Sequence, residues 1–508
     1  MDRLTSIRRG ASPWVFGAQG ESGFRREIAR FFVSSTRVLP GFVFCFSALM
    51  ELAVAEDCLS IHNVAWNFDR DVMFPKVCPV RNNIRINKGG VAVKPKAVLA
   101  YCREKGIKAV DLRFPDIGGN WKHITFPVSA LTEGVFDSGF GQELTLRGIS
   151  HESREQMVLI PISNANYLDP LIEQPTLVIL ASIQDAMTRE ESWLDSRAVA
   201  SRALEYLKST GIADDVEVRA CQPFLIHHVP RGERSERGGG ESEPVPSSQR
   251  FLSCGPSDAD FGFRCKLTTL AAEAGVGIER HYRGQRASSE VVLAPSNLIE
   301  TCDNLMMIRY MIDQLAAAEE VSLVPTALAC STQWGLIRNS ETIFSGSYQQ
   351  GVSDIGWYAI GGVLKHATAL AALALATHQF SPTMEYRWLR MVSSSDPDAI
   401  CNVIFGSHNP RSRAIEFRGT PSISNPYIHL AAVMMAMIDG IQNKYPGTVS
   451  VDAGSGRDGL SVAGGEGGIP DPRRLSQSLI EDRDFLLYGD VFSEGLLDLL
   501  TEFLSLDR

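Results

Sequence analysis

The sequence lacks the closely spaced cysteine pairs that mark several common metal and redox sites. Its ten cysteines are spread over the chain, and no two of them are spaced as Cys-x-x-Cys. Zinc ribbons and thioredoxin-like motifs both need that spacing. The sequence therefore excludes these two classes of site, and the scattered cysteines favour a reducing, cytoplasmic compartment.

The chain also lacks an excess of positive charge. Lys and Arg number 49 against 59 Asp and Glu, which gives a formal net charge of −10 at pH 7. Nucleic acids and anionic membrane surfaces attract basic proteins, so we expect no nucleic-acid partner and no membrane partner. A hydrophobic content of 44% with 21% charged residues predicts a folded protein rather than a disordered one.

Hydrophobic runs long enough to cross a membrane are missing as well. The most apolar stretch near the N-terminus is LPGFVFCFSALMELAVA, residues 39–55, and it contains Glu51. A membrane-spanning helix needs about 20 apolar residues. The stretch also begins too late for a signal peptide. We interpret residues 1–90 as an irregular N-terminal extension and assign no chemistry to them.

An ordered pattern begins near residue 95 and predicts a small α+β unit over residues 95–185. PKAVLAYCREKG has helical spacing and ends in a glycine stop. Val110, Leu112 and Phe114 alternate with polar residues, which predicts a half-buried strand. Gly118–Gly119 then marks a turn between two strands.

Residues 186–508 predict a larger unit of helices and strands. Residues 230–258 are polar and rich in Gly, Ser and Pro, so we expect a flexible insertion there. The Ser-Asn-Pro sequence at 424–426 combines a helix cap with proline at the first helical position. Periodicity predicts helices over residues 196–211, 298–318, 356–378 and 424–443.

The segment SRAIEFR, residues 412–418, places a carboxylate and a guanidinium on one face of a predicted strand. Residues i and i+2 of a strand point to the same side, so Glu416 and Arg418 share a face. One interpretation is a solvent-exposed ion pair of little functional meaning. The other is that Glu416 holds a cation while Arg418 holds a phosphate or a carboxylate.

The segment EVRACQPFLIHHV, residues 217–229, raises the question of a zinc site. Cys221 and His227 share a strand face, but six residues of strand span about 20 Å, and His228 faces the other side. We therefore interpret the segment as a core strand. Pro223 lacks a backbone donor, so the strand should be distorted or lie at an edge there.

From about residue 97 to the C-terminal helix, the order of short segments resembles the glutamine synthetase family. The resemblance implies an N-terminal β-grasp domain at 95–185. It also implies a glutamine synthetase/guanido kinase-like catalytic domain of curved antiparallel strands backed by helices at 186–508. The segments that carry the resemblance are VDLRFPDIGGNWKHITFPV, YLDP, RAVASRALEYLKSTGIADD, AEAGVGIERH, CDNLMMIRY, AIGGVLKHATAL, RAIEFR, SNPYIHLAAVMMAMIDGIQNK and DRDFLLYGDVF.

The resemblance also implies a chemistry. The family uses ATP to phosphorylate the side-chain carboxylate of glutamate, and ammonia then displaces the phosphate to give glutamine. Two divalent cations, Mg²⁺ or Mn²⁺, and several arginines offset the repulsion between the negative groups. The family assembles into rings with sites between subunits. The implied partners are therefore ATP, glutamate and further copies of the chain, with an active paralogue as a further expectation.

Some implied site positions keep a suitable residue. Glu416 falls on a metal-binding glutamate of the family, and Arg418 falls on the arginine that binds the substrate glutamate. Glu290 falls on a second metal-ligand position, with a surface glutamate as the alternative. Asp137 is the candidate for the acid that helps to deprotonate ammonium. Arg413 lies one step from the arginine used toward the phosphates.

Other implied positions have lost their chemistry. Cys221 and Pro223 fall on two metal-binding glutamates. Ile337 falls on the histidine that binds metal and phosphate, and Asn339 falls on its nucleotide-contacting companion. Gly335 remains from a glycine-rich substrate-binding loop.

Two hypotheses follow from this mixture of kept and lost positions. The first is a family member with impaired or lost ligase activity, a pseudoenzyme that acts as a structural, regulatory or ligand-binding protein. The second is a working ligase for glutamate and ammonia, or for a related acid and amine, with a rearranged metal site. Mg²⁺ or Mn²⁺ with ATP is expected only under the second hypothesis.

Overall fold

The computed structural model describes most of the chain beyond residue 93, and the described residues lie within one unit, Arg81–Arg508. The predicted N-terminal extension, most of the predicted insertion at 230–258 and His228 lie outside the described residues. The described ranges are 94–143, 156–227, 251–284, 288–324, 328–346, 351–377, 401–404, 413–447 and 472–505.

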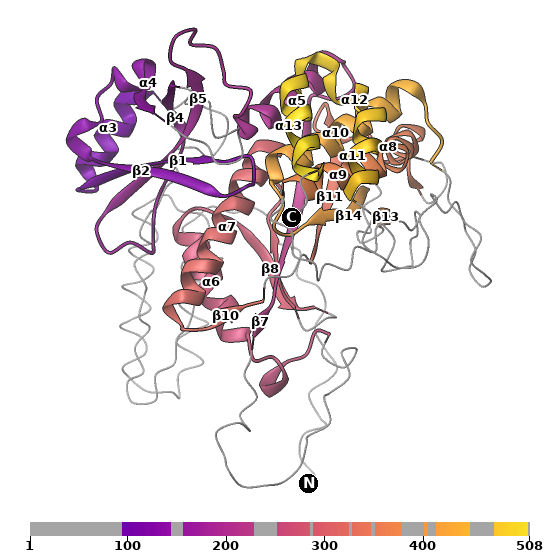
Figure 1. Ribbon diagram of the computed structural model, residues 1–508. Coiled ribbons are helices and arrows are strands. Elements are labelled where there is room, and N and C mark those ends of the chain that lie inside the picture. Colours follow the sequence, from indigo (N-terminus) through magenta and orange to yellow (C-terminus); the bar gives the residue numbers. More distant parts are fainter. Residues whose placement is uncertain are drawn as a thin grey trace, which may run out of the picture. The chain divides into compact units, whose positions relative to one another are not determined.

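The first of two main sheets has five strands in the order β2-β1-β5-β4-β3 (Figure 1). β1 and β5 run parallel, and the other neighbours run antiparallel. As predicted, a helix precedes this sheet, and Gly106 follows it with φ of 63°. The elements are α3 (Pro95–Glu104), β1 (Ala109–Pro115), β2 (Trp121–Pro127), η1 (Val128–Ala130), α4 (Val135–Ser138), β3 (Phe140–Glu143), β4 (Gln156–Leu168) and β5 (Thr176–Asp185).

The prediction that β1 is half-buried is wrong, because every residue of β1 is buried. Its polar face carries Asp111 and Arg113, which lie in a buried network instead of facing solvent. Arg113 donates to Asp111, to the Tyr167 hydroxyl and to Asp169, at 2.6–2.8 Å. Tyr310 stacks on the guanidinium, with 4.2 Å from its ring centroid to the Arg113 Cζ. Because these charged side chains hydrogen-bond to one another, they can be buried. The alternation of apolar and polar residues along β1 therefore did not predict its burial.

The second sheet is antiparallel and follows the order β13-β14-β11-β6-β9-β8, with β12 paired to the end of β11. A separate two-stranded sheet joins β7 to β10. Pro223 lies at the penultimate position of β6, so the ladder donor that it lacks falls at a strand end. The strands are β6 (Asp215–Phe224), β7 (Ile226–His227), β8 (Ile278–Arg283), β9 (Ser289–Leu293), β10 (Ser322–Leu323), β11 (Ala329–Arg338), β12 (Glu341–Thr342), β13 (Cys401–Ile404) and β14 (Ala414–Pro421).

Helices cover one face of the second sheet, with α5 and α7 against β6 and α9 against β14 (Figure 1). Three predicted helices are confirmed, and the Asn425 side chain caps α10 just before Pro426, as predicted. The helical elements are α5 (Ser196–Ser209), η4 (Gly255–Ser257), α6 (Phe261–Glu273), α7 (Leu298–Ala318), α8 (Asp354–Lys365), α9 (Ala367–Ala376), α10 (Pro426–Asn443), α11 (Pro472–Glu481), α12 (Asp484–Leu487), η7 (Tyr488–Asp490) and α13 (Glu494–Ser505).

The single helix predicted over 356–378 is two helices, α8 and α9, bent by 59° at His366. The His366 side chain is buried between two carboxylates. Its Nε2 lies 2.8 Å from Asp439 on α10, and its Nδ1 lies 2.8 Å from Asp482, just after α11. The ring stacks on Phe485 at 3.8 Å. We call these contacts the His366 clamp, and they hold the His366 ring at the bend between the two helices.

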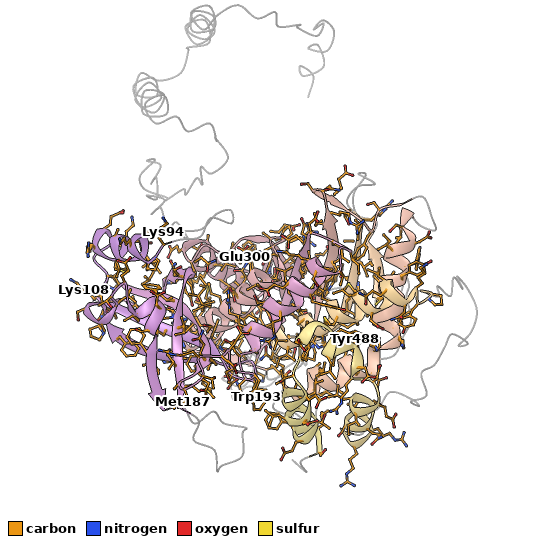
Figure 2. All side chains as sticks on the ribbon, turned by 90° about the horizontal axis from the view of Figure 1, so that it is seen from above. Lys94, Lys108, Met187, Trp193, Glu300 and Tyr488 are labelled. Atoms are coloured by element: carbon orange, nitrogen blue, oxygen red, sulfur yellow. The ribbon has the colours of Figure 1, made fainter. Side chains whose placement is uncertain are left out.

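Among the described helices, none is by itself long and apolar enough to span a membrane. The bent pair α8 and α9 reaches the required length and composition only when the two helices are taken together. Nearly all residues of α9 are buried within the protein, where they pack against α11, α13 and α10. Figure 2 shows the side chains that fill the space between the helices and sheets, with Met187 at the margin.

Two glycines allow α8 and α10 to cross in close contact. A Cβ added at Gly362 would lie 2.0 Å from the Ala436 carbonyl oxygen and 2.7 Å from the Gly440 Cα. A Cβ added at Gly440 would lie 2.3 Å from the Tyr358 carbonyl oxygen. These are backbone atoms, which cannot move aside without separating the helices.

Replacing Gly362 by alanine should therefore lower the free energy of unfolding by about 1–3 kcal/mol through overpacking. The matched control is Gly262→Ala in α6, where a Cβ would meet nothing within 4 Å. That change should raise stability slightly, by at most about 0.5 kcal/mol, because Gly262 is the second residue of α6, where alanine gains less than in a helix interior. Urea unfolding of both variants tests whether the two changes in the free energy of unfolding have opposite signs. Two equal shifts would contradict the inferred contact.

Candidate functional site

One face of the second sheet points away from the covering helices and carries most of its polar side chains. On β6, Val216, Val218 and Ala220 are buried, whereas Glu217 is exposed and Arg219 is partly exposed. The odd-numbered residues of β6 therefore share the face opposite the helices. The strand registers extend this face to Glu290 and Tyr282 on β9 and β8, to Ser331 and Gln333 on β11, and to Glu416 and Arg418 on β14. We call it the polar face.

At one side of the polar face, the Glu290 carboxylate is surrounded by neutral donors. The Cys221 thiol donates to Oε2 at 3.6 Å, and the Ser288 hydroxyl donates to Oε1 at 3.2 Å. The Tyr282 hydroxyl is a neutral neighbour of both Glu290 and Cys221. Burial, followed by the nearby Glu290 carboxylate, raises the pKa of Cys221 well above its usual value. Both the thiol and the phenol are therefore protonated donors at neutral pH.

At the other side, Glu416 and Arg418 contact each other. Arg418 Nε and Nη2 lie 2.9 and 2.7 Å from Glu416 Oε2. The Glu416 side chain is 7% exposed and that of Arg418 is 30% exposed, so the pair is not the fully solvated one of the first interpretation. Next along the face, Gln333 lies between Glu416 and Arg219, and its Oε1 accepts from Arg219 at 2.9 Å. Arg219 also pairs with Glu279 at 2.6 Å.

The structure does not bring all the sequence-derived candidates to this centre. Ile337 lies opposite Asp215, whereas Cys221 lies opposite Ser331, six residues back along β11. Asn339 is exposed in the turn after β11, with φ of 51°, and its backbone N–H donates to Asp214. Gly335 lies opposite Glu217.

The other two candidates lie away from the polar face. Asp137 is exposed on the short helix α4, beside the first sheet. Arg413 lies just before β14, and its guanidinium packs over Gly351, where a Cβ would lie 3.1 Å from its Nε. On this chain alone, neither residue joins Glu290 or Glu416.

The described residues do not form the alternative zinc site. β6 ends at Phe224, and His227 is exposed on β7, while Cys221 is buried on β6. Among the residues that the structure describes, no group of three or more His, Cys, Asp or Glu could hold a metal ion. Cys221 also lies beside a carboxylate, and its raised pKa opposes the thiolate that zinc would need.

The described donor set does not fit a pair of Mg²⁺ or Mn²⁺ ions either. Such ions need several carboxylate oxygens each, and the polar face offers Glu290 and Glu416, with Glu217 exposed farther along β6 opposite Gly335. The strands β6 and β11 lie between Glu290 and Glu416, so three strand spacings of about 4.8 Å separate them across the sheet. Glu416 is already paired with Arg418, and Glu290 is already surrounded by donors.

Comparison with known proteins identifies the family. Residues 193–457 match the model for the glutamine synthetase catalytic domain. Over 446 residues, the chain is 30% identical to the glutamine synthetase of Aquifex aeolicus, covering 80% of this chain and 94% of that protein. The chain belongs to the glutamine synthetase family. The enzyme of Frankia alni is 28% identical over 456 residues, covering 82% of this chain and 95% of that protein.

The fold agrees with this glutamine synthetase assignment. The structure is similar to the cryo-EM structure of Plasmodium falciparum glutamine synthetase, with a TM-score of 0.69. The match covers 81% of this chain and 95% of that chain, at 16% identity. The mixed α/β architecture expected from the resemblance is therefore confirmed.

Sequence reasoning missed four residues of this glutamine synthetase-family polar face: Arg219, Tyr282, Ser288 and Gln333. For Arg219 a signal was available, because it lies two residues before Cys221 and so shares its strand face. Ser288 offered the same signal, because it lies two residues before Glu290. Tyr282 reaches Glu290 through the β8–β9 register. Gln333 reaches Arg219 and Glu416 through β11. No local spacing rule gives those registers.

Proposed function

We propose that this member of the glutamine synthetase family has impaired or lost ATP-dependent ligation of ammonia to glutamate. The observation that carries the proposal is the residue type at two positions of β6. Cys221 and Pro223 stand where the family resemblance implies two metal-binding glutamates. Without the cations, the charges of the γ-phosphate and of glutamate are not compensated. That loss should remove several kcal/mol of transition-state stabilisation, or several powers of ten in rate.

The β11 register supports a refinement of the implied histidine positions. Ser331 lies directly opposite Cys221, so we propose that Ser331 and Gln333, rather than Ile337 and Asn339, occupy the places of the two lost histidines. A serine and an amide there would leave the polar face without a nitrogen ligand for a divalent cation.

Further parts of the proposal follow from the family. We propose that the five-stranded sheet and its helices form the β-grasp domain, and that the chain assembles as a ring-type homo-oligomer, with an active paralogue as a second partner. Arg418 would contact glutamate, Arg413 would lie near nucleotide, and Asp137 would act in a neighbouring subunit's site. The seven cysteines that the structure describes are free, which supports a reducing compartment such as the cytoplasm.

The alternative is a working ligase for glutamate and ammonia, or for a related acid and amine, with a rearranged metal site. The retained Glu290, Glu416 and Arg418 favour it. In that case Mg²⁺ or Mn²⁺ with ATP would be its cofactors. Residues outside the described ranges, or a second subunit, would then have to supply the missing ligands.

The test is phosphate release by the purified full-length protein with ATP, glutamate, ammonium and either Mg²⁺ or Mn²⁺. We expect no release above background from a sample shown to be folded by its cooperative urea transition. A related glutamine synthetase assayed in parallel is the positive control. Release that requires both glutamate and ammonium would overturn the proposal and establish the alternative.

A further inference from the structure

We infer that the chain holds the Glu290 carboxylate with its own neutral donors where a divalent cation would otherwise be needed, so that the folded site is independent of metal. The inference rests on the proposed function in one respect, since both take Cys221 to stand at a lost metal-ligand position. It goes further, because it says what replaced the cation and what the replacement does for stability.

The contacts around Glu290 occupy both carboxylate oxygens. Oε2 accepts from the Cys221 thiol and Oε1 accepts from the Ser288 hydroxyl. Tyr282 lies opposite Glu290 in the strand pair, and its hydroxyl is a further neutral neighbour of the carboxylate. A partly buried carboxylate whose two oxygens both accept hydrogen bonds is satisfied without a counter-ion.

The backbone also closes over the carboxylate. A Cβ at Gly284 would lie 2.1 Å from Glu290 Oε1 and 2.3 Å from the Ser288 hydroxyl oxygen. The Gly284 N–H donates to the Ser288 carbonyl at 2.8 Å, which fixes that close approach. A divalent ion keeps six or more oxygen ligands around it, and the Oε1 side of Glu290 is already filled by backbone and hydroxyl atoms.

The experiment compares the wild-type protein with Cys221→Glu and Cys221→Gln. The two variants have side chains of nearly the same size, but only Cys221→Glu places a second carboxylate against Glu290. Thermal unfolding is measured for the full chain in EDTA, and then with Mn²⁺ alone in excess over the chelator. Mn²⁺ is the probe, and no substrate or nucleotide is added.

We expect the wild-type protein and Cys221→Gln to unfold at the same temperature in EDTA and in Mn²⁺. Cys221→Glu should unfold several degrees lower than Cys221→Gln in EDTA, because like charges repel, and Mn²⁺ should recover most of that difference. A saturable rise in the wild-type unfolding temperature with Mn²⁺ would overturn the inference. Equal unfolding temperatures of Cys221→Glu and Cys221→Gln in EDTA would also overturn it.

A second variant keeps the test decisive if Cys221→Glu does not fold. Tyr282→Phe removes the hydroxyl beside Glu290 and retains the ring. We expect a lower unfolding temperature than that of the wild type, with no recovery in Mn²⁺, because no ligand has been added. No loss of stability would contradict the role given to Tyr282. These experiments measure stability, whereas the proposed function is tested by phosphate release. The inference and the proposed function can therefore fail independently of each other.

Discussion

Replacing Arg113 by methionine is expected to lower the free energy of unfolding by about 3–5 kcal/mol at pH 7, because two buried carboxylates lose their counter-ion. The side chains of Asp111 and Asp169 are almost fully buried, and each contacts the guanidinium at 2.6–2.7 Å. The Tyr310 hydroxyl on α7 also donates to Asp169 at 2.9 Å. The variant should therefore loosen the contact of β1 and β4 with α7 as well.

The same variant should show a characteristic pH dependence. Burial alone would raise the pKa of Asp111, but hydrogen bonds from Thr125, His123 and Arg113 outweigh it and lower the pKa. A lowered carboxyl pKa contributes stability that is present above the unfolded value, near pH 3.8, and is lost as the pH falls below it. The deficit of Arg113→Met should therefore shrink in acid.

Urea unfolding at pH 7 and near pH 3 measures both effects. The control is Arg483→Met, which removes an exposed ion pair with Asp498, whose side chain is 68% exposed. Exposed pairs contribute at most about 1 kcal/mol, so this variant should change little. If Arg113→Met is no less stable than this control, the buried network does not stabilise the fold.

Replacing His429 by leucine is expected to protect the protein against acid. His429 on α10 is fully buried, its ring lies beside Phe417, and neither ring nitrogen has a hydrogen-bond partner among the described residues. Burial lowers its pKa from 6.5 to about 3. At pH 7 the leucine variant should equal or exceed the wild-type stability, since an unsatisfied buried polar group costs about 1–3 kcal/mol.

The difference between the two proteins should grow as the pH falls. The unfolded chain binds a proton at His429 near pH 6.5, whereas the folded chain does so only near pH 3. The wild type therefore loses about 1.4 kcal/mol per pH unit below 6.5, up to about 5 kcal/mol near pH 3. The leucine variant should lose none of this.

Urea unfolding of both proteins between pH 7 and pH 4 checks the expectation. Met435→Leu, another buried change on α10, alters no titrating group, so its difference from the wild type should be independent of pH. A difference between His429→Leu and the wild type that stays constant over this range would show that His429 does not titrate as inferred.

Local signals in the sequence predicted much of the fold. The helices α5, α7 and α10 and the cap at Asn425 follow from periodicity and capping chemistry, which act within a few residues. The break at His366 was missed, because its cause is the pair Asp439 and Asp482, which are distant in sequence. The burial of β1 was missed because the partners of Arg113 lie on other elements.

The candidate site was predicted less well, because strand register decides which residues meet. Glu416 and Arg418 were placed on one face correctly, since the alternation within a strand is a local property. Which residue of β11 lies opposite Cys221 depends on pairing between strands that are more than 100 residues apart. The ladder pairs Ser331 with Cys221 and Ile337 with Asp215, and counting along the sequence could not give either pair.

The His366 clamp joins the C-terminal ends of α10 and α11. One imidazole holds Asp439 near the end of the first helix and Asp482 just after the second, so the two helix ends are joined through His366. The entropic cost of closing a chain between two fixed ends grows only with the logarithm of its length, by about 0.6 kcal/mol for each doubling. Because His366 bonds residues that lie 73 and 116 positions away, these contacts form only after the long chain segments between them have closed, and they mark a late, non-local step in folding.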